Sequence, residues 1–353
     1  MITAIGLIKN SADIIESFIR CNANVVDNFV LLNNMSTDRT MDILDSLKKE
    51  GYQIEVIPDN IIAHTQSVKL TNLLYYTKKK YDSDLFVPID DDEVIFSPNS
   101  GAAGSEINYY LKNLRNSRDL HYLRWRVYFP FDHDDANEIC VPKRQTLYFD
   151  GAKSSIGKCI VSNKLLEDGS FQLLQGNHGG NGNLIENRFF YNDLLMGHYP
   201  CRSTEQVTSK ATLGWLSNLA NKNRGTTWAY HRKQIFDIIK SGTPVSNALM
   251  KLMAFKYLEL DSADMDVNKE MIPLPAECFK ISYTNLHEFD TVKNLILYAE
   301  DMAKKSGTGI PAEFYTIPDT EDERFQMLIK LCEYTEEMAI RYAENITEVH
   351  NDY

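Results

Sequence analysis

Short apolar runs alternate with helical patterns through the N-terminal part of the chain. The apolar runs, rich in β-branched side chains, fall at 2–8, 28–32, 52–56 and 85–89, and apolar residues recur at helical spacing between them. Strands that alternate with helices predict a parallel sheet with right-handed crossovers, of Rossmann type. The expected fold is therefore α/β, with a mostly parallel sheet flanked by helices and with ligands at the carboxyl ends of the strands.

Four consecutive carboxylates, Asp90 to Glu93, follow the last of these runs directly. Crowding them at a strand end is unfavourable unless a cation relieves the repulsion. Mg²⁺ or Mn²⁺ does this well, since it prefers oxygen ligands and leaves several positions to phosphates and water. Asp90 and Asp92 point the same way because side chains alternate along extended backbone. A solvated acidic loop is the alternative, but the position at a strand end favours a metal site.

Two weaker signals accompany the acidic cluster. The turn 33–38 follows the second strand and is typical of a structural turn that caps the next helix, but it shares the sheet edge with the carboxylates. His178 and His198 each lie beside glycine, and each is a metal ligand, a base or a polar surface residue. Arg202 and Lys210 either meet phosphate charge or belong to ordinary surface.

The pattern changes in the middle of the chain. A long aromatic strand is predicted at 122–129, with short strands at 146–149 and 158–162. The remainder is mostly helical, with helices expected at 204–220, 226–241, 246–260, 287–305 and 321–346. We expect a catalytic domain over 1–215 and a helical C-terminal region over 216–353.

Charge and cysteine content argue against several classes of protein. The net charge is −12, and a nucleic acid is not an expected partner because phosphate contacts need clustered Lys and Arg. No apolar run approaches the ~20 residues of a membrane-spanning helix, and Lys9, Asp13 and Glu16 interrupt what would be a signal peptide. Six scattered cysteines without metal-binding spacing favour a reduced, cytoplasmic protein.

These segments resemble, in their order along the chain, the motifs of glycosyltransferase family 2, whose members have the GT-A fold. The branch that they resemble begins with a "VKNE" segment and carries "DNxSxDxT" and "DxDEF". The corresponding segments are 8–11 (IKNS), 33–40 (NNMSTDRT), 90–95 (DDDEVI), 158–161 (KCIV), 176–178 (GNH) and 197–203 (GHYPCRS). The resemblance covers about residues 1–215 and does not explain the helical remainder.

The resemblance implies transfer of a sugar from a nucleotide-sugar donor to a glycan, a lipid-linked acceptor or another hydroxyl group, with Mn²⁺ or Mg²⁺ and with inversion. Asp90 and Asp92 would serve the metal and the diphosphate, and His198 would join the metal, with His178 as second candidate. The metal would offset the charge on the leaving nucleoside diphosphate. Further donor-binding residues would be Lys9, Asn10, Asn33, Asn34, Ser36, Asp38, Lys69, Asp91 and Arg202.

Two positions depart from the family pattern. Asn33 stands where the family has an acid that accepts the uracil N–H, so the donor base stays open, and Ser11 replaces a Glu. These departures motivate one alternative, a non-catalytic carbohydrate-binding relative. A second alternative is a metal-dependent nucleotidyl- or phosphotransferase that uses the same carboxylates.

An inverting transfer also needs a base near the acceptor hydroxyl, with a pKa tuned toward neutrality. The expected catalytic set is Asp92, with His178 or Glu186 as base. Further candidates, among which the sequence does not choose, are Asp132, Asp134, Asp135 and Glu138. The region 216–353 is expected to shape the acceptor site, to form a homo-oligomer or to contact the inner face of a membrane peripherally.

Overall fold

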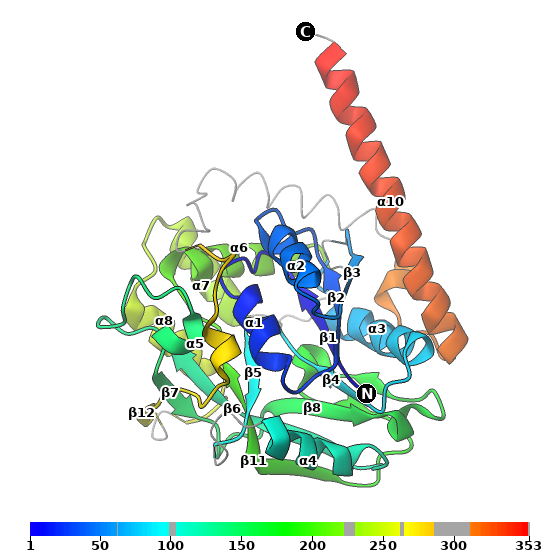
Figure 1. Ribbon diagram of the computed structural model, residues 1–353. Coiled ribbons are helices and arrows are strands. Elements are labelled where there is room, and N and C mark those ends of the chain that lie inside the picture. Colours follow the sequence, from blue (N-terminus) through cyan, green and yellow to red (C-terminus); the bar gives the residue numbers. More distant parts are fainter. Residues whose placement is uncertain (62, 99–103, 222–229, 262–264, 286–310, 352–353) are drawn as a thin grey trace.

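Four parallel strands form one half of the central sheet, in the order β4-β1-β2-β3 (Figure 1). The computed structural model describes residues 1–61, 63–98, 104–221, 230–261, 265–285 and 311–351. The strands are β1 (Ile2–Ile8), β2 (Asn28–Asn33), β3 (Ile54–Pro58) and β4 (Leu85–Pro88). They are connected by α1 (Ile15–Asn22), α2 (Thr40–Lys49) and α3 (Gln66–Lys80). The predicted alternation of strands and helices is confirmed.

Helices cover both faces of this half of the sheet because successive side chains of a strand point to opposite sides. In β2, Phe29 and Leu31 pack in the same cluster as α1 and α2, whereas Val30 and Leu32 pack with α3. Burial on both faces is the physical reason that these strands are continuous apolar runs in the sequence.

The other half of the sheet is mixed. Beyond β4 follow β8, β6, β7 and β12, each antiparallel to its neighbour, while β11 runs parallel to β6 and antiparallel to β5. Their bounds are β5 Glu93–Phe96, β6 Leu120–Phe129, β7 Leu147–Asp150, β8 Gly157–Ser162, β11 Arg188–His198 and β12 Val267–Lys269. Strand β11 was not predicted, because its polar residues interrupt any alternation. The whole is an α/β fold of the Rossmann-like GT-A kind, with a C-terminal helix.

Helices predominate after β11, as predicted. They are α6 (Thr204–Leu219), α7 (Tyr230–Lys240), α8 (Asn247–Lys256) and α10 (Glu321–Asn351), with short turns η4 (Ala276–Phe279) and η5 (Ala312–Tyr315). The helix expected at 287–305 lies outside the described residues. Shorter elements before β11 are α4 (Gly104–Leu114), α5 (Val141–Arg144), η1 (Asn163–Leu166), β9 (Gln172–Leu173), η2 (Gln175–Asn177) and β10 (Gly180–Asn181).

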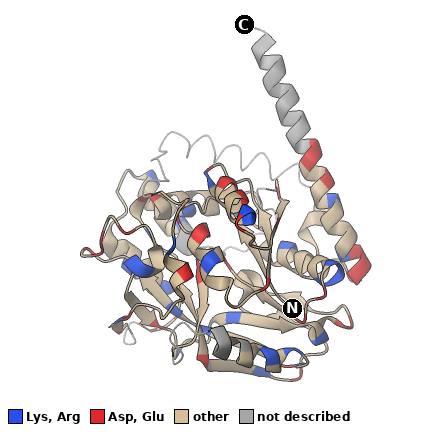
Figure 2. Ribbon diagram, viewed as in Figure 1, with Lys and Arg blue, Asp and Glu red and all other residues tan. Residues whose placement is uncertain are grey.

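Helix α10 begins beside the end of α3, and opposite charges join the two helices (Figure 2). Nζ of Lys78 lies 3.0 Å from Oε2 of Glu321, and Nζ of Lys79 lies 2.8 Å from Oδ1 of Asp322. Leu328 of α10 is buried in the same hydrophobic cluster as α3. Two of the three lysines that end α3 therefore meet the acidic start of a helix that is remote in sequence.

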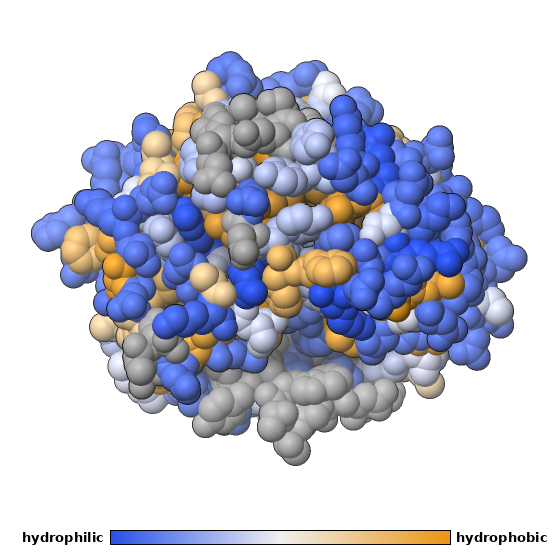
Figure 3. Space-filling view, turned by 90° about the horizontal axis from the view of Figure 1, so that it is seen from below, coloured by the Kyte–Doolittle hydropathy of each residue, from blue (hydrophilic) through white to orange (hydrophobic). Residues whose placement is uncertain are grey.

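The face of the molecule seen in Figure 3 is mainly hydrophilic, and its hydrophobic side chains form separate areas. Large apolar side chains that are exposed in the described part of the chain are Tyr109, Phe131, Leu174, Phe189, Leu252, Val267 and Met271. Within the described ranges, none of the helices combines the length and the hydropathy that crossing a membrane requires.

Candidate active site

A cavity of about 350 Å³ opens at the carboxyl ends of the parallel strands. Lys9 after β1, Asn34 after β2 and the turn 90–92 after β4 line one side of it. The opposite wall comes from α6 and from the end of α8, through residues that include Lys210 and Tyr257. Residues that follow three separate strands thus meet at one edge of the sheet, as parallel pairing requires.

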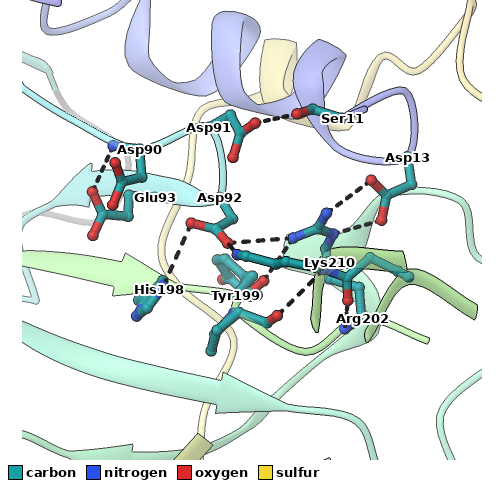
Figure 4. A network of polar contacts seen from close by, with 12 residues as sticks. Ser11, Asp13, Asp90, Asp91, Asp92, Glu93, His198, Tyr199, Arg202 and Lys210 are labelled. Carbon is teal, nitrogen blue, oxygen red and sulfur yellow. Dashed lines mark hydrogen bonds and ion pairs between the residues drawn. The ribbon is translucent and has the colours of Figure 1, made fainter. Parts of the chain in front are cut away.

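Asp92 lies at the centre of the polar network in this cavity (Figure 4). Its Oδ2 contacts Nζ of Lys210 and lies 3.4 Å from Nη1 of Arg202, and its Oδ1 lies 3.5 Å from Nε2 of His198. The side chain is 1% exposed. Burial opposes its charged form, but Lys210, His198 and Arg202 outweigh that effect and hold the pKa of Asp92 well below its usual value. Asp92 is therefore an ionised carboxylate.

Strand β11 and the turn after it bring these partners to Asp92. His198, the last residue of β11, pairs with Glu93 in register, and the N–H of Tyr199 donates to the carbonyl of Asp92 at 2.8 Å. Arg202 is fixed in turn by Asp13, which accepts from Nε at 2.5 Å and from Nη2 at 2.9 Å. Sequence analysis missed Asp13 as a site residue, because its partner is 189 residues away.

A buried lysine pairs with two carboxyl groups of the acidic turn. Nζ of Lys158, on β8, lies 2.5 Å from Oδ2 of Asp90 and 3.4 Å from Oε1 of Glu93. Glu93 also accepts from Nε1 of Trp125 at 3.0 Å and from the N–H of Asp90 at 2.8 Å. Burial raises the pKa of Glu93 to about 8, so its carboxyl group is mostly protonated at neutral pH. Lys158 belongs to the segment 158–161 of the family resemblance but was not expected as a site residue; a lysine within a mostly apolar run is the signal that could have found it.

Ser11 donates its hydroxyl to Oδ2 of Asp91. Burial, followed by the charge of Asp92, raises the pKa of Asp91 to about 7. A carboxylate in place of Ser11 would add another negative charge at this point, whereas the hydroxyl supplies a donor. Together with Lys158, these pairings explain how the turn 90–93 accommodates four carboxyl groups without four unopposed charges.

His178 lines the cavity, and one of its two ring nitrogens has a defined partner. Its Nδ1 lies 3.1 Å from the carbonyl of Gly157, so Nδ1 carries the proton and Nε2 is left as the acceptor. Burial, and then the charge of Lys158, lowers the pKa of His178 to about 4. The ring packs against Gly176, where φ is +72° and an added Cβ would lie 2.5 Å from Nε2. His178 is therefore a neutral imidazole in a fixed orientation.

Three residues that the resemblance assigned to the donor lie in the linked turns after β1 and β2. Oδ1 of Asn33 accepts from the N–H of Ser36 at 3.1 Å, and Oγ of Ser36 accepts from the N–H of Asn10 at 3.0 Å. Asp38 accepts from the N–H of Ala12 at 3.0 Å. Asn10 lines the cavity, whereas Asn33, Ser36 and Asp38 do not. Their bonds hold the two loops together.

Lys9 and Asn34 line the cavity and belong to a second buried network. Nζ of Lys9 donates to Oδ1 of Asn34 at 3.1 Å, and Nδ2 of Asn34 donates to Oδ2 of Asp59 at 2.9 Å and to the carbonyl of Ile61 at 2.8 Å. Lys69 pairs with Asp59 at 2.5 Å beneath them and does not line the cavity. Burial, and then the charge of Lys69, lowers the pKa of Lys9 to about 8.

The structure separates the candidate bases. Glu186 is exposed and does not line the cavity. The other acidic candidates do not line the cavity either; these are Asp132, Asp134, Asp135 and Glu138. Glu259, which sequence analysis missed, does line it and has a left-handed backbone with φ of 49°. Of the bases expected from the sequence, His178 thus lies in the cavity wall, and Glu259 is a further candidate there.

The donor atoms at Asp92 and His198 fit a divalent cation that takes few protein ligands. In the described ranges, no three His, Cys, Asp or Glu side chains come together as a metal site. Oδ1 of Asp92 faces Nε2 of His198 at a distance too long for a strong hydrogen bond, and Nδ1 of His198 is buried with no partner among the described residues. Mg²⁺ or Mn²⁺ commonly uses one or two protein ligands and completes its shell with phosphate and water.

Comparison with known proteins gives remote structural likenesses only. No protein-family model matches the sequence, and no curated protein sequence matches it. A mannosyltransferase from Pyrobaculum calidifontis, solved with GDP-Man and Mn²⁺, aligns over 86% of this chain and 86% of its own, at 12% identity and a TM-score of 0.38. Glucosyl-3-phosphoglycerate synthase from Mycobacterium tuberculosis, solved with Mn²⁺, UDP and glucosyl-3-phosphoglycerate, aligns over 70% of this chain and 81% of its own, at 14% identity and a TM-score of 0.31.

Proposed function

We propose that this chain is a metal-dependent glycosyltransferase of the family 2, GT-A type, which transfers a sugar from a nucleoside diphosphate donor to a hydroxyl acceptor. The observation that supports this proposal is the cavity at the carboxyl edge of the sheet, where Asp92 faces His198 and the cations Arg202 and Lys210 stand beside them. A diphosphate needs positive charge, and this arrangement supplies it next to two potential metal ligands.

In this proposal Asp92 and His198 hold Mn²⁺ or Mg²⁺, which when bound supplies a positive charge for the diphosphate. Arg202 and Lys210 add positive charge on the same side, where it stabilises the leaving group as its charge develops. Lys158 does not reach the substrate. It holds Asp90 in place and prevents the acidic turn from repelling the diphosphate.

His178 is the proposed base. Its Nε2 is left unprotonated because Nδ1 is held by the carbonyl of Gly157, and the residue lines the cavity. The acceptor hydroxyl would give its proton to Nε2 as the oxygen attacks the anomeric carbon, and attack opposite to the leaving group would give inversion. Glu259 is the second candidate for this role, since it lines the same cavity.

The C-terminal region is proposed to shape the acceptor side of the cavity. Met253, Lys256 and Tyr257, from α8 and the residue after it, line the wall, and the ring of Tyr257 lies 4.9 Å from that of His198. We also propose that the chain consists of two units, the catalytic domain 1–215 and the helical region 216–353. A cytoplasmic location is proposed from the cysteines, because all six are free.

A thermal-shift panel of UDP, GDP, CDP and dTDP, each with and without Mn²⁺, tests the proposal. A nucleotide at a hundred times its Kd stabilises the folded state by about 2.7 kcal/mol, so the nucleotide that matches the site should raise Tm, and more so with Mn²⁺. The absence of a shift with any nucleotide would favour a non-catalytic carbohydrate-binding protein. Release of pyrophosphate instead of an intact nucleoside diphosphate would identify a nucleotidyltransferase.

A further inference from the structure

Lys210 occupies an unusual place for a lysine in a binding cavity. It lies on the face of α6 that lines the cavity, yet its Nζ is turned to Oδ2 of Asp92 and not into the open space. Its side chain is 33% exposed, whereas that of Asp92 is 1% exposed. The ammonium group thus reaches the buried carboxylate from a side chain that is itself partly open to solvent.

The second cation at Asp92 is held differently. Arg202 is 4% exposed and is fixed by Asp13, which accepts from both Nε and Nη2, and its Nη1 also donates to the carbonyl of Tyr199 at 3.1 Å. Within the described residues, the hydrogen bond recorded for Nζ of Lys210 is the one to Asp92. Arg202 is therefore a fixed partner of the carboxylate, and Lys210 is a partner that can leave.

We propose that Lys210 is the resident counter-ion of Asp92 in the ligand-free protein, and that it moves from Asp92 to the donor diphosphate when a divalent cation takes its place. The inference rests on the proposed function and adds a role for one residue. Departure of Lys210 does not leave Asp92 unpaired, because Arg202 and His198 remain beside it. The flexible stem of lysine allows its ammonium group to follow the diphosphate along the cavity wall.

The charges around Asp92 make the two states mutually exclusive. A divalent cation on Oδ1 would lie within a few ångströms of the ammonium group on Oδ2, and like charges at that separation repel strongly in a buried site. A diphosphate carries enough negative charge to accept both the cation and the ammonium group. The lysine therefore opposes binding of the metal alone and favours binding of the metal together with the diphosphate.

Binding of Mn²⁺ and of nucleotide to Lys210→Met tests this inference, because the two affinities should change in opposite directions. The first measurement is the electron paramagnetic resonance signal of free Mn²⁺ during titration of the protein without nucleotide. Loss of the competing ammonium group should tighten Mn²⁺ binding by about tenfold. The second is calorimetric titration of UDP and GDP at saturating Mn²⁺, where the same variant should bind the matching nucleotide about tenfold more weakly.

Lys80→Met is the matched control, because it removes the same charge from another lysine that is paired with a carboxylate. Lys80 pairs with Glu55 at 2.6 Å and ends α3, so it is remote from the cavity that Gln66 reaches at the start of that helix. It should leave both affinities unchanged. Lys210→Arg, which retains a cation, should restore weak Mn²⁺ binding and tight nucleotide binding, and Lys210→Gln replaces the Met variant if the latter does not fold.

The outcomes separate this inference from the proposed function. Mn²⁺ affinity that is unchanged or weaker in Lys210→Met overturns the role of Lys210, even where the nucleotide binds normally. Tighter Mn²⁺ binding without any nucleotide binding to the wild-type protein supports the counter-ion role at Asp92 but contradicts the glycosyltransferase. Absence of Mn²⁺ binding to both proteins, with and without nucleotide, overturns both.

Discussion

Nε2 of His198 lies 3.5 Å from Oδ1 of Asp92, although the two residues belong to separate strands and loops. The pairing of β11 with β5 in the register that sets His198 opposite Glu93 is what produces this geometry. Trp125 packs on the other side of the imidazole, with ring centroids 4.5 Å apart, and limits its rotation. His198, the last residue of β11, and Asp92, the turn residue before β5, are thus positioned by the pairing of these two strands.

Replacing either of these ligands should remove metal-supported nucleotide binding. Asp92→Ala deletes the carboxylate, and His198→Ala deletes the imidazole, so each should abolish the additional Tm shift that Mn²⁺ gives with the matching nucleotide. The double variant should be no worse than either single variant, because the two residues act through one ion. Nucleotide affinity in Mn²⁺ that is unchanged in Asp92→Ala would contradict the site assignment. Urea unfolding of each variant separates loss of binding from loss of folding.

The pH dependence of turnover should not show the ionisation of a histidine with an ordinary pKa. Because the pKa of His178 is lowered to about 4, its imidazole stays unprotonated throughout the range from pH 5 to 7, and activity lost through its protonation should appear only near pH 4. His178→Gln should reduce kcat by about 10²–10⁴-fold. A limb of kcat/KM near pH 6.5 that disappears in this variant would contradict the perturbed pKa. A variant with normal kcat would move the base to Glu259.

Nucleotide affinity should fall as the pH rises through about 8. The pKa of Lys9 is lowered to about 8 by burial and then by Lys69, so its ammonium group is present below that pH and lost above it. A cation lining the cavity favours an anionic ligand, and its neutralisation removes that attraction. The Kd measured by calorimetry should therefore rise between pH 7 and 9 in the wild-type protein. Lys9→Arg, whose charge persists, should give a shallower profile, in which deprotonation of Asp91 and Glu93, with pKa values of about 7 and about 8, accounts for the remaining slope. An unchanged slope in that variant would rule out Lys9 as a cause.

Local sequence patterns predict the parts of this fold that local burial determines. The apolar runs of β1, β2 and β4 were predicted because both faces of those strands are buried, and the acidic turn was placed at a sheet edge because it follows β4 directly. The cavity at that edge follows from the parallel order of the strands. The prediction needed no knowledge of contacts between distant residues.

The remaining features depend on long-range pairing, which no local pattern reveals. Arg202 meets Asp13 and Lys158 meets Asp90 only after β11 and β8 have taken their places in the sheet. Asn33 and Ser36 carry residue types that suit both a ligand and a turn, and the structure bonds them to neighbouring loops. Polar residues at a strand end are therefore ambiguous in sequence until their backbone partners are known.

Removal of the Glu16 carboxylate should destabilise the protein and release the segment after η4. Glu16 is fully buried, pairs with Arg20 at 2.9 Å, and accepts from the backbone N–H groups of Ser282, Tyr283 and Thr284 at 2.8–3.0 Å. Glu16→Ala leaves three backbone N–H groups without this partner and leaves Arg20 with Glu50 as its remaining carboxylate, and should cost about 3 kcal/mol. Urea unfolding measures the loss, and hydrogen exchange at 282–284 should accelerate. Normal exchange there would show that other contacts hold the segment.

Arg324 should be the residue that fixes α10 to the body of the protein. Its side chain is 1% exposed and donates to the carbonyl of Pro318 at 2.7 Å, to that of Asp319 at 3.2 Å and to that of Gly169, while its guanidinium lies 4.5 Å from the ring centroid of Tyr75. Arg324→Met retains an unbranched apolar side chain but leaves these carbonyl groups without their hydrogen-bond donor. The substitution should lower the free energy of unfolding by about 3 kcal/mol.

Amide exchange through 321–337 should rise in Arg324→Met more than in Lys79→Met, which removes only the exposed pair with Asp322. The reason is that the buried guanidinium joins α10 to the loop at Gly169 as well as to its own N-terminal turn, whereas the exposed pair is screened by solvent. Equal exchange in the two variants would show that the apolar contacts of Leu328 and its neighbours, and not Arg324, hold the helix.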